Sequence, residues 1–169
     1  MAKLLASRTA QYPLVAEFVF EHNNWVVDSV DATKKTLGST VALSTDPNEA
    51  ALNGPVANTI TFDAIPLPLG AVVCGGEVIV EEAYAGCTAA TLKVGIAGAL
   101  EVYQAAANVD LMAAANTRDA LLLTTSLASN AGANVRLTIA YTVANATAGK
   151  IRVRVMYTID GKVAENTLT

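Results

Sequence analysis

Two segments near the C-terminal end of the chain alternate apolar and polar side chains with a period of two. In residues 135–143 the odd positions are branched, aromatic or otherwise apolar, and the even positions carry mainly Arg and Thr. Residues 151–159 repeat this pattern. Successive side chains of a strand point to opposite faces, so each segment predicts a strand with one face in the core and one face exposed to solvent. Residues 145–149 between the two segments indicate a turn, so we expect an antiparallel hairpin over 135–159. This feature indicates antiparallel β structure but names no activity.

Similar alternation elsewhere predicts roughly eight to ten strands with few helical segments. The further expected strands cover 14–21, 25–30, 37–43, 58–63, 71–84, 91–96 and 120–125. The turn at His22–Asn24 predicts that the first two of these form a hairpin. Strands of this number and spacing are typical of a β-sandwich or a jelly roll.

The strand expected over 71–84 contains the pair Gly75-Gly76. Paired glycines inside a strand indicate a bulge or a sharp bend. We expect one face to carry Val72, Cys74, Val78 and Val80 and the other to carry Glu77 and Glu81.

Residues 99–115 interrupt the alternation. Alanine runs and helical spacing of apolar residues predict one or two short helical turns within a long connection. The whole pattern predicts an all-β, antiparallel, jelly-roll-like sandwich. We expect an extended N-terminal arm over residues 1–13 and a single sandwich domain over 14–169.

The composition is unusual for a protein that faces water on all sides. Charged residues are 15% of the chain, against about 25% in ordinary globular proteins, and the formal net charge is −4. A surface of small uncharged residues suits contact with other subunits, because its burial leaves no charged group without a partner. The alternative is a neutral surface that simply faces water. The absence of a basic run argues against nucleic-acid binding, and the absence of a long apolar run argues against a membrane span.

No pattern of catalytic or metal-binding residues is present. His22 is the single histidine and lies in an expected turn, so a nucleophilic triad or a cupin-type metal site is not predicted. Cys74 and Cys87 lack the partners of a zinc site. We expect them to be buried free thiols, with pairing as the alternative. The sequence therefore predicts a protein without enzymatic activity, cofactor or metal.

Several side chains are candidates for contacts between subunits. Arg136, Arg152 and Arg154 form a cationic stripe on the polar face of the expected hairpin, and Glu77 and Glu81 are natural cross-strand partners. The alternative is an ordinary wet face. Tyr12, at the end of the expected arm, is a further candidate.

One stretch resembles a known family. The residues are Thr61–Gly76, which include Ile65-Pro66-Leu67-Pro68-Leu69-Gly70-Ala71-Val72-Val73, then Glu77–Tyr84 and Thr91-Leu92-Lys93-Val94-Gly95. Together with a closing strand over 149–157, they are similar to the small structural proteins of tailed-bacteriophage particles. The motifs describe turns and core, so no individual functional residue carries over.

The resemblance implies a virion component, assembled in the host cytoplasm, and in particular a capsid decoration (cement) protein. It implies that the partners are the major capsid protein and copies of the chain itself, as a homotrimer. A tail or fibre module that binds carbohydrate or protein is the alternative, with Trp25 as the candidate sugar platform. Tail-tube and head-completion roles also stay open.

Overall fold

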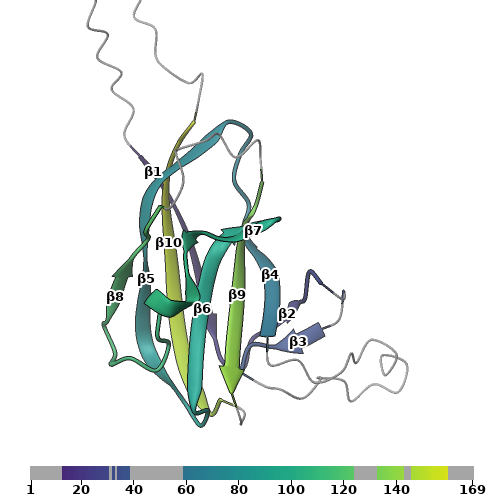
Figure 1. The fold of residues 1–169 in the computed structure, drawn as a ribbon, viewed down its shortest axis with the longest axis vertical. Helices are drawn as coiled ribbons and strands as arrows, with labels where there is room; N and C mark the ends of the chain where they lie inside the picture. The colour runs from purple at the N-terminus through teal and green to yellow at the C-terminus, as the bar shows by residue number, and fades with distance from the viewer. Residues whose placement is uncertain are drawn as a thin grey trace, which may run out of the picture.

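The computed structural model describes residues 13–30, 32, 34–38, 59–123, 133–142 and 146–159. These residues form an all-β sandwich of two four-stranded antiparallel sheets, with a small two-stranded hairpin beside it (Figure 1). The predicted all-β antiparallel sandwich is therefore confirmed. The expected arm over 1–13 lies almost wholly outside the described residues.

Each sheet joins strands that are distant in sequence. The first sheet has the order β1 (Leu14–Glu21), β10 (Ala148–Ile159), β5 (Ala71–Ala85), β8 (Arg118–Ala120). The second has the order β4 (Thr59–Ile65), β9 (Val135–Thr142), β6 (Ala89–Ile96), β7 (Ala99–Gln104). The separate hairpin pairs β2 (Trp25–Val27) with β3 (Lys34–Thr36).

The core lies between the two sheets, where the inward residues of every long strand meet. The odd residues of β9 and of the inner half of β10, such as Leu137 and Val153, are fully buried, as the alternation predicted. Phe18, Phe20 and Phe62 join the edges of the two sheets, with ring centroids 5.9–6.2 Å apart. Burial of these apolar side chains is the main force that holds the two layers together.

Both expected hairpins were wrong. β9 and β10 do not pair: β9 lies between β4 and β6, whereas β10 lies between β1 and β5 in the other sheet. β1 pairs with β10 rather than with β2, so Leu14 lies opposite Tyr157. Alternation identifies a strand and its two faces, but it carries no information about which strand lies beside it.

The predicted bulge in β5 is present. In the part of the strand before the bulge, the face that points into the core is the opposite of the predicted one. Met156 lies opposite Gly75 and Tyr157 opposite Val73, so Cys74 is the extra residue. Before the bulge Val73 joins the core cluster, whereas Val72 and Cys74 do not; after it Val78 and Val80 face inward. The prediction that Val72 and Cys74 share the face of Val78 was therefore wrong, because one extra residue reverses the side-chain phase.

The segment 99–115 was expected to be a connection with helical turns, but Ala99–Gln104 forms β7. Pairing with β6 overrides the helix propensity of its Ala and Leu residues. A single 3-10 turn, η2 (Ala106–Asn108), follows. The expected strand over 120–125 is placed earlier, as β8. The strand expected over 37–43 lies mostly outside the described residues, and β3 precedes it.

Candidate functional site

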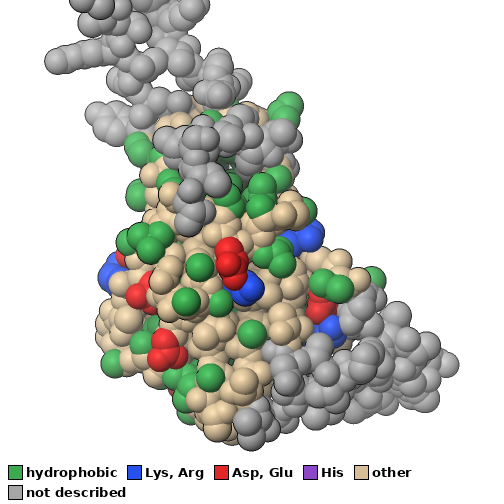
Figure 2. Space-filling model, viewed as in Figure 1, with side chains coloured by type: hydrophobic (Ala, Val, Ile, Leu, Met, Phe, Trp, Pro, Cys, Tyr) green, Lys and Arg blue, Asp and Glu red, His purple; other side chains and the backbone are tan. Residues whose placement is uncertain are grey.

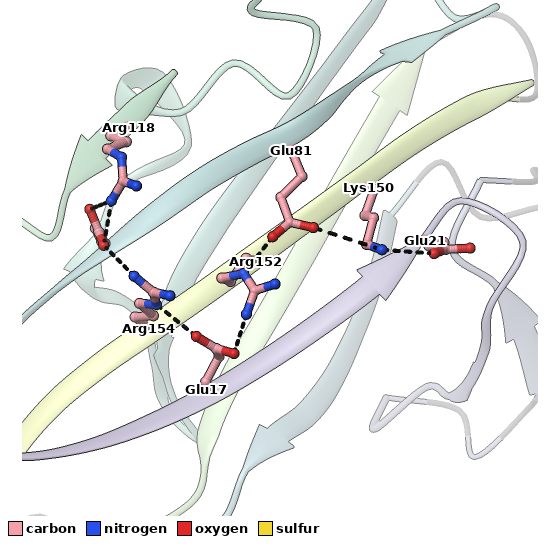
Figure 3. Close-up of polar contacts among 8 residues, drawn as sticks. Glu17, Glu21, Glu81, Arg118, Lys150, Arg152 and Arg154 are labelled. Carbon is pink, nitrogen blue, oxygen red and sulfur yellow. Dashed lines mark hydrogen bonds and ion pairs between the residues drawn. The ribbon is translucent and has the colours of Figure 1, made fainter. Parts of the chain in front are cut away.

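The outward face of the first sheet carries a continuous network of charged side chains, which we call the ion-pair face. It draws residues from all four strands of that sheet (Figure 3). Its members are Glu17, Glu21, Glu77, Glu81, Arg118, Lys150, Arg152 and Arg154. The antiparallel pairing places Glu17 directly opposite Arg154, and Arg154 opposite Glu77.

The contacts alternate in sign along one unbroken chain. Arg118 donates to both carboxylate oxygens of Glu77, at 2.9 and 3.0 Å, and Arg154 Nη1 lies 3.3 Å from the same carboxylate. Arg154 Nε donates to Glu17 at 2.6 Å, and Arg152 Nη1 donates to the other oxygen of Glu17. The two arginines therefore share one carboxylate.

The chain of contacts continues to the end of β1. Arg152 Nε donates to Glu81 at 2.5 Å. Lys150 Nζ lies 3.8 Å from Glu81 and 3.3 Å from Glu21. Each positive group, apart from Arg118 at one end, thus contacts two carboxylates, and the four acidic and four basic side chains neutralise one another.

Hydrogen bonding within the network shifts the pKa values of Glu17, Arg152 and Arg154. The pKa of Glu17 is lowered, first by the hydrogen bond from Arg154 and against the effect of desolvation. The pKa values of Arg152 and Arg154 are raised, chiefly by their hydrogen bonds to Glu81 and Glu17 respectively. These shifts favour the charged forms of Glu17, Arg152 and Arg154 at neutral pH.

An open groove of about 620 Å³ lies at one end of the ion-pair face. Its apolar walls include Val15 and Met156, which lie opposite each other in the β1–β10 register, together with Gly76 and Ala120. Val15 is 60% exposed and Met156 39%. The face thus combines a neutralised charge network with an exposed apolar end.

The structure brings four of the predicted contact residues together and separates Arg136 from them. Arg152 and Arg154 pair with Glu81 and Glu77, as the stripe predicted. Arg136 belongs to the other sheet, so its expected place in the stripe was wrong; its Nε donates to Asp63 at 2.7 Å. That hydrogen bond lowers the pKa of Asp63. Tyr12 lies outside the described residues, and the contact role of the set stays a prediction.

Sequence reasoning missed Glu17, Glu21, Lys150 and Arg118. The first two alternate with apolar residues in a strand that was correctly predicted, so their outward direction was available from the pattern. Their partners were not, because β1 was assigned to a hairpin with the following strand. Pairing of β1 with β10, which only the fold shows, aligns Glu21 with Lys150.

The other candidate groups show no convergence within the described ranges. His22 lies in the turn after β1, where its backbone N–H donates to the Gly149 carbonyl. Cys74 and Cys87 are free thiols, and burial raises the pKa of Cys87. In the part of the chain that the structure describes, no three His, Cys, Asp or Glu side chains could hold a metal ion together. No helix there has the length and hydrophobicity of a membrane span.

Comparisons with known proteins give a likeness in fold. No protein-family model matches the sequence, and no characterised protein matches it in sequence. A chain in the capsid asymmetric unit of cyanophage Pam1 has a similar structure, with a TM-score of 0.53 and 19% sequence identity. The match covers 94% of each chain. The two chains therefore share a fold along nearly their whole length.

Proposed function

We propose that this chain is a non-enzymatic structural protein of a tailed-bacteriophage virion, namely a capsid decoration (cement) protein that self-associates and binds the major capsid protein. One observation carries the proposal: the similar chain, alike over 94% of both lengths, belongs to a phage capsid asymmetric unit. The strand order supports the finer assignment to a jelly roll, because two four-stranded antiparallel sheets exchange successive strands across the core. Its place of action would be the virion.

The surface of the described residues suits a protein that is covered by neighbours. Charged side chains are sparse on the face drawn in Figure 2, where backbone, uncharged polar side chains and hydrophobic side chains dominate. The ion-pair face is neutral within itself, so a neighbouring subunit can cover it without leaving an unpaired charge. The adjoining groove adds exposed apolar area, which supplies a driving force for association.

Binding to capsids that lack the protein tests the proposal. Val15→Asp combined with Met156→Asp places two charges in the groove, and we expect fewer bound copies per capsid at a given concentration. Ala99→Asp is the matched control, because Ala99 is exposed on the edge strand of the other sheet. Equal binding by both variants and the unchanged protein would remove the groove from the interface.

Three further measurements test the arm, the oligomeric state and the position in the virion. A variant lacking residues 1–13 tests the arm, and decoration at unchanged affinity would show that the arm is not needed. Light scattering of the purified protein tests the proposed homotrimer. The copy number per virion separates a shell protein, with copies comparable to the major capsid protein, from a tail or portal protein with only a few.

The carbohydrate-binding alternative is less well supported. Trp25 is exposed, as a sugar platform requires, but the Lys34 ammonium lies 4.7 Å from its ring centroid. One face of the ring is therefore in a cation–π contact. Glycan-array binding that is lost in Trp25→Ala would favour this alternative.

A further inference from the structure

β1 is an edge strand of the first sheet, and its outer side pairs with no other described strand. Its eight residues pair with β10 without a register shift. The other edge strands are shorter or less regular: β8 has three residues, and the pairings of β4 and β7 each contain a register shift. Short or bulged strands protect a sheet edge from pairing with other chains. Among the described strands, β1 therefore has the edge most open to such pairing.

The register shows which backbone groups of β1 face this open edge. Opposite residues of an antiparallel pair alternate between exchanging two hydrogen bonds and exchanging none. The His22 N–H donates to the Gly149 carbonyl at 2.9 Å, so in this register the even residues of β1 bond to β10. The N–H and C=O groups of the odd residues therefore point away from β10. Glu21 agrees with this assignment, because its N–H donates to Asn24 Oδ1 and its carbonyl accepts from the Asn24 N–H.

Three residues of β1 keep unpaired backbone groups at this edge. Within the described residues, the N–H and C=O groups of Val15, Glu17 and Val19 have no backbone partner. The open stretch ends on both sides, because the Asn24 turn occupies Glu21 and Pro13 has no N–H. Each residue contributes one donor and one acceptor, so one added antiparallel strand would satisfy all of these groups together.

The side chains of β1 also suit contact with another strand. Natural edges are often protected by Lys or Pro, and residues 14–20 contain neither. Leu14 is 45% exposed, Val15 60% and Val19 36%, so the strand offers apolar area. The single charged residue of 14–20 is Glu17, which accepts hydrogen bonds from two arginines of β10. A neighbour can therefore cover the strand without leaving this charge unpaired.

We propose that β1 pairs with β1 of a second copy as antiparallel strands, about a two-fold axis beside Glu17. In this register Val15 lies opposite Val19 of the second copy, and Glu17 lies opposite Glu17. The occupant is a second copy because its β1 offers the same three free residues, so the two edges are self-complementary. Valine faces valine on the outward side, and each Glu17 is already held by its own arginines. The two four-stranded sheets then form one continuous sheet.

The inference deepens the self-association in the proposed function and names its surface. The contact joins copies in pairs, so the proposed homotrimer would close through other surfaces and trimers would pair with one another. Its tests use the purified full-length protein without capsids. A negative result would therefore remove the β1 contact and leave capsid binding to be decided by its own experiment.

Sedimentation equilibrium tests whether copies pair through this edge. We expect the mass to double as the concentration rises. Val15→Pro removes an N–H that makes no bond to β10, so it leaves the ladder of the sheet intact. It should pair at least about tenfold more weakly, because each contact loses two hydrogen bonds. Val15→Ile keeps the N–H and is the matched control. A mass that never doubles, or equal pairing by Val15→Pro and Val15→Ile, would overturn the proposal.

Disulfide cross-linking tests the register and decides the matter if Val15→Pro does not fold. Val15→Cys and Val19→Cys are made separately in a Cys74→Ser background, where the remaining Cys87 is buried. Positions 15 and 19 lie opposite each other, with Cα atoms about 5.5 Å apart. Position 15 of one copy lies about 13 Å from position 15 of the other, beyond the reach of a disulfide. Mild oxidation should therefore give a covalent dimer in the mixture of the two variants and not in either variant alone.

The cross-linking result also separates other occupants of the edge. Association without a covalent dimer in the mixture would mean that a different segment of the second copy pairs with β1. A covalent dimer formed equally well by either variant alone would show random collision. Both outcomes would refute the proposed pairing.

Discussion

A single methyl group at Gly76, which follows the bulge in β5, should have a large effect on this fold. Gly76 has a φ of +149°, and a Cβ atom there would lie 2.2 Å from the Arg154 carbonyl oxygen and 2.7 Å from Leu121 Cδ1. Gly76→Ala therefore combines backbone strain of about 1–3 kcal/mol with overpacking of about 1–3 kcal/mol. We expect the free energy of unfolding to fall by about 2–6 kcal/mol, a large part of a typical total.

Urea unfolding, followed by circular dichroism, measures this loss. With a slope of about 2 kcal/mol per molar, the midpoint should fall by about 1–3 M. Two glycines in the same chain separate the causes. Gly98 has a φ of +82° and open space around its Cβ position, so Gly98→Ala reports strain alone and should cost about 1–2 kcal/mol. At Gly75 a Cβ would meet only the flexible end of Met156, at 2.8 Å, so Gly75→Ala should cost less than about 1 kcal/mol.

The order of the three variants tests the reasoning. Gly76→Ala must be clearly the most destabilised, because only there does a methyl group meet backbone. If Gly76→Ala unfolds at the same urea concentration as Gly98→Ala, the strand relaxes around the bulge and the steric argument fails. The bulge also directs Glu77 outward, so a folded Gly76→Ala protein should have a weakened ion-pair face.

Three further predictions concern single groups. Glu17→Gln should lower the melting temperature at neutral pH. Since the pKa of Glu17 is lowered from 4.5 in the folded state, its contribution is present above pH 4.5 and is lost as the pH falls through the lowered value, so the difference should vanish in acid. Tyr84→Phe removes a buried hydrogen bond and should cost about 1 kcal/mol. Tyr141→Phe removes a hydroxyl that has no partner among the described residues and should cost nothing. Cys74 should react with a thiol reagent before the buried Cys87, whose pKa is raised.

Each of these three predictions has a control or an outcome that would contradict it. Glu82→Gln changes the same charge on an exposed side chain of β5, and a pH profile like that of Glu17→Gln would show a general charge effect. Equal urea midpoints for the two Tyr variants would mean that the Tyr84 hydroxyl adds no net stability. Persistence of the fast thiol reaction in Cys74→Ser would assign it to Cys87.

Much of the sheet architecture was predictable because alternation is a local property. The strands at Leu14–Glu21, Ala71–Ala85 and Val135–Thr142 were found within a few residues, and the buried face of Val135–Thr142 was predicted correctly. The stretch at Ala99–Gln104 failed for a physical reason: Ala and Leu favour helix in isolation, and only pairing with β6 makes that segment a strand.

The ion-pair face could also be predicted only in part. Arg152 and Arg154 could be placed on one wet face, and Glu77 and Glu81 could be suggested as their partners, because residues two apart on a strand share a face. Glu17, which joins the two arginines, could not be assigned to them, because Glu17 and Arg152 meet across strands that are far apart in the sequence.

By itself the sequence determined the class of structure, the two faces of most strands, the bulge at the paired glycines and the low charge of the surface. All of these follow from side-chain chemistry and from neighbours within a few residues. The tertiary structure alone decided which strands lie side by side. Partner choice sums weak contacts over the whole core, and no short segment carries it. The ion-pair face exists because β1 and β5 flank β10.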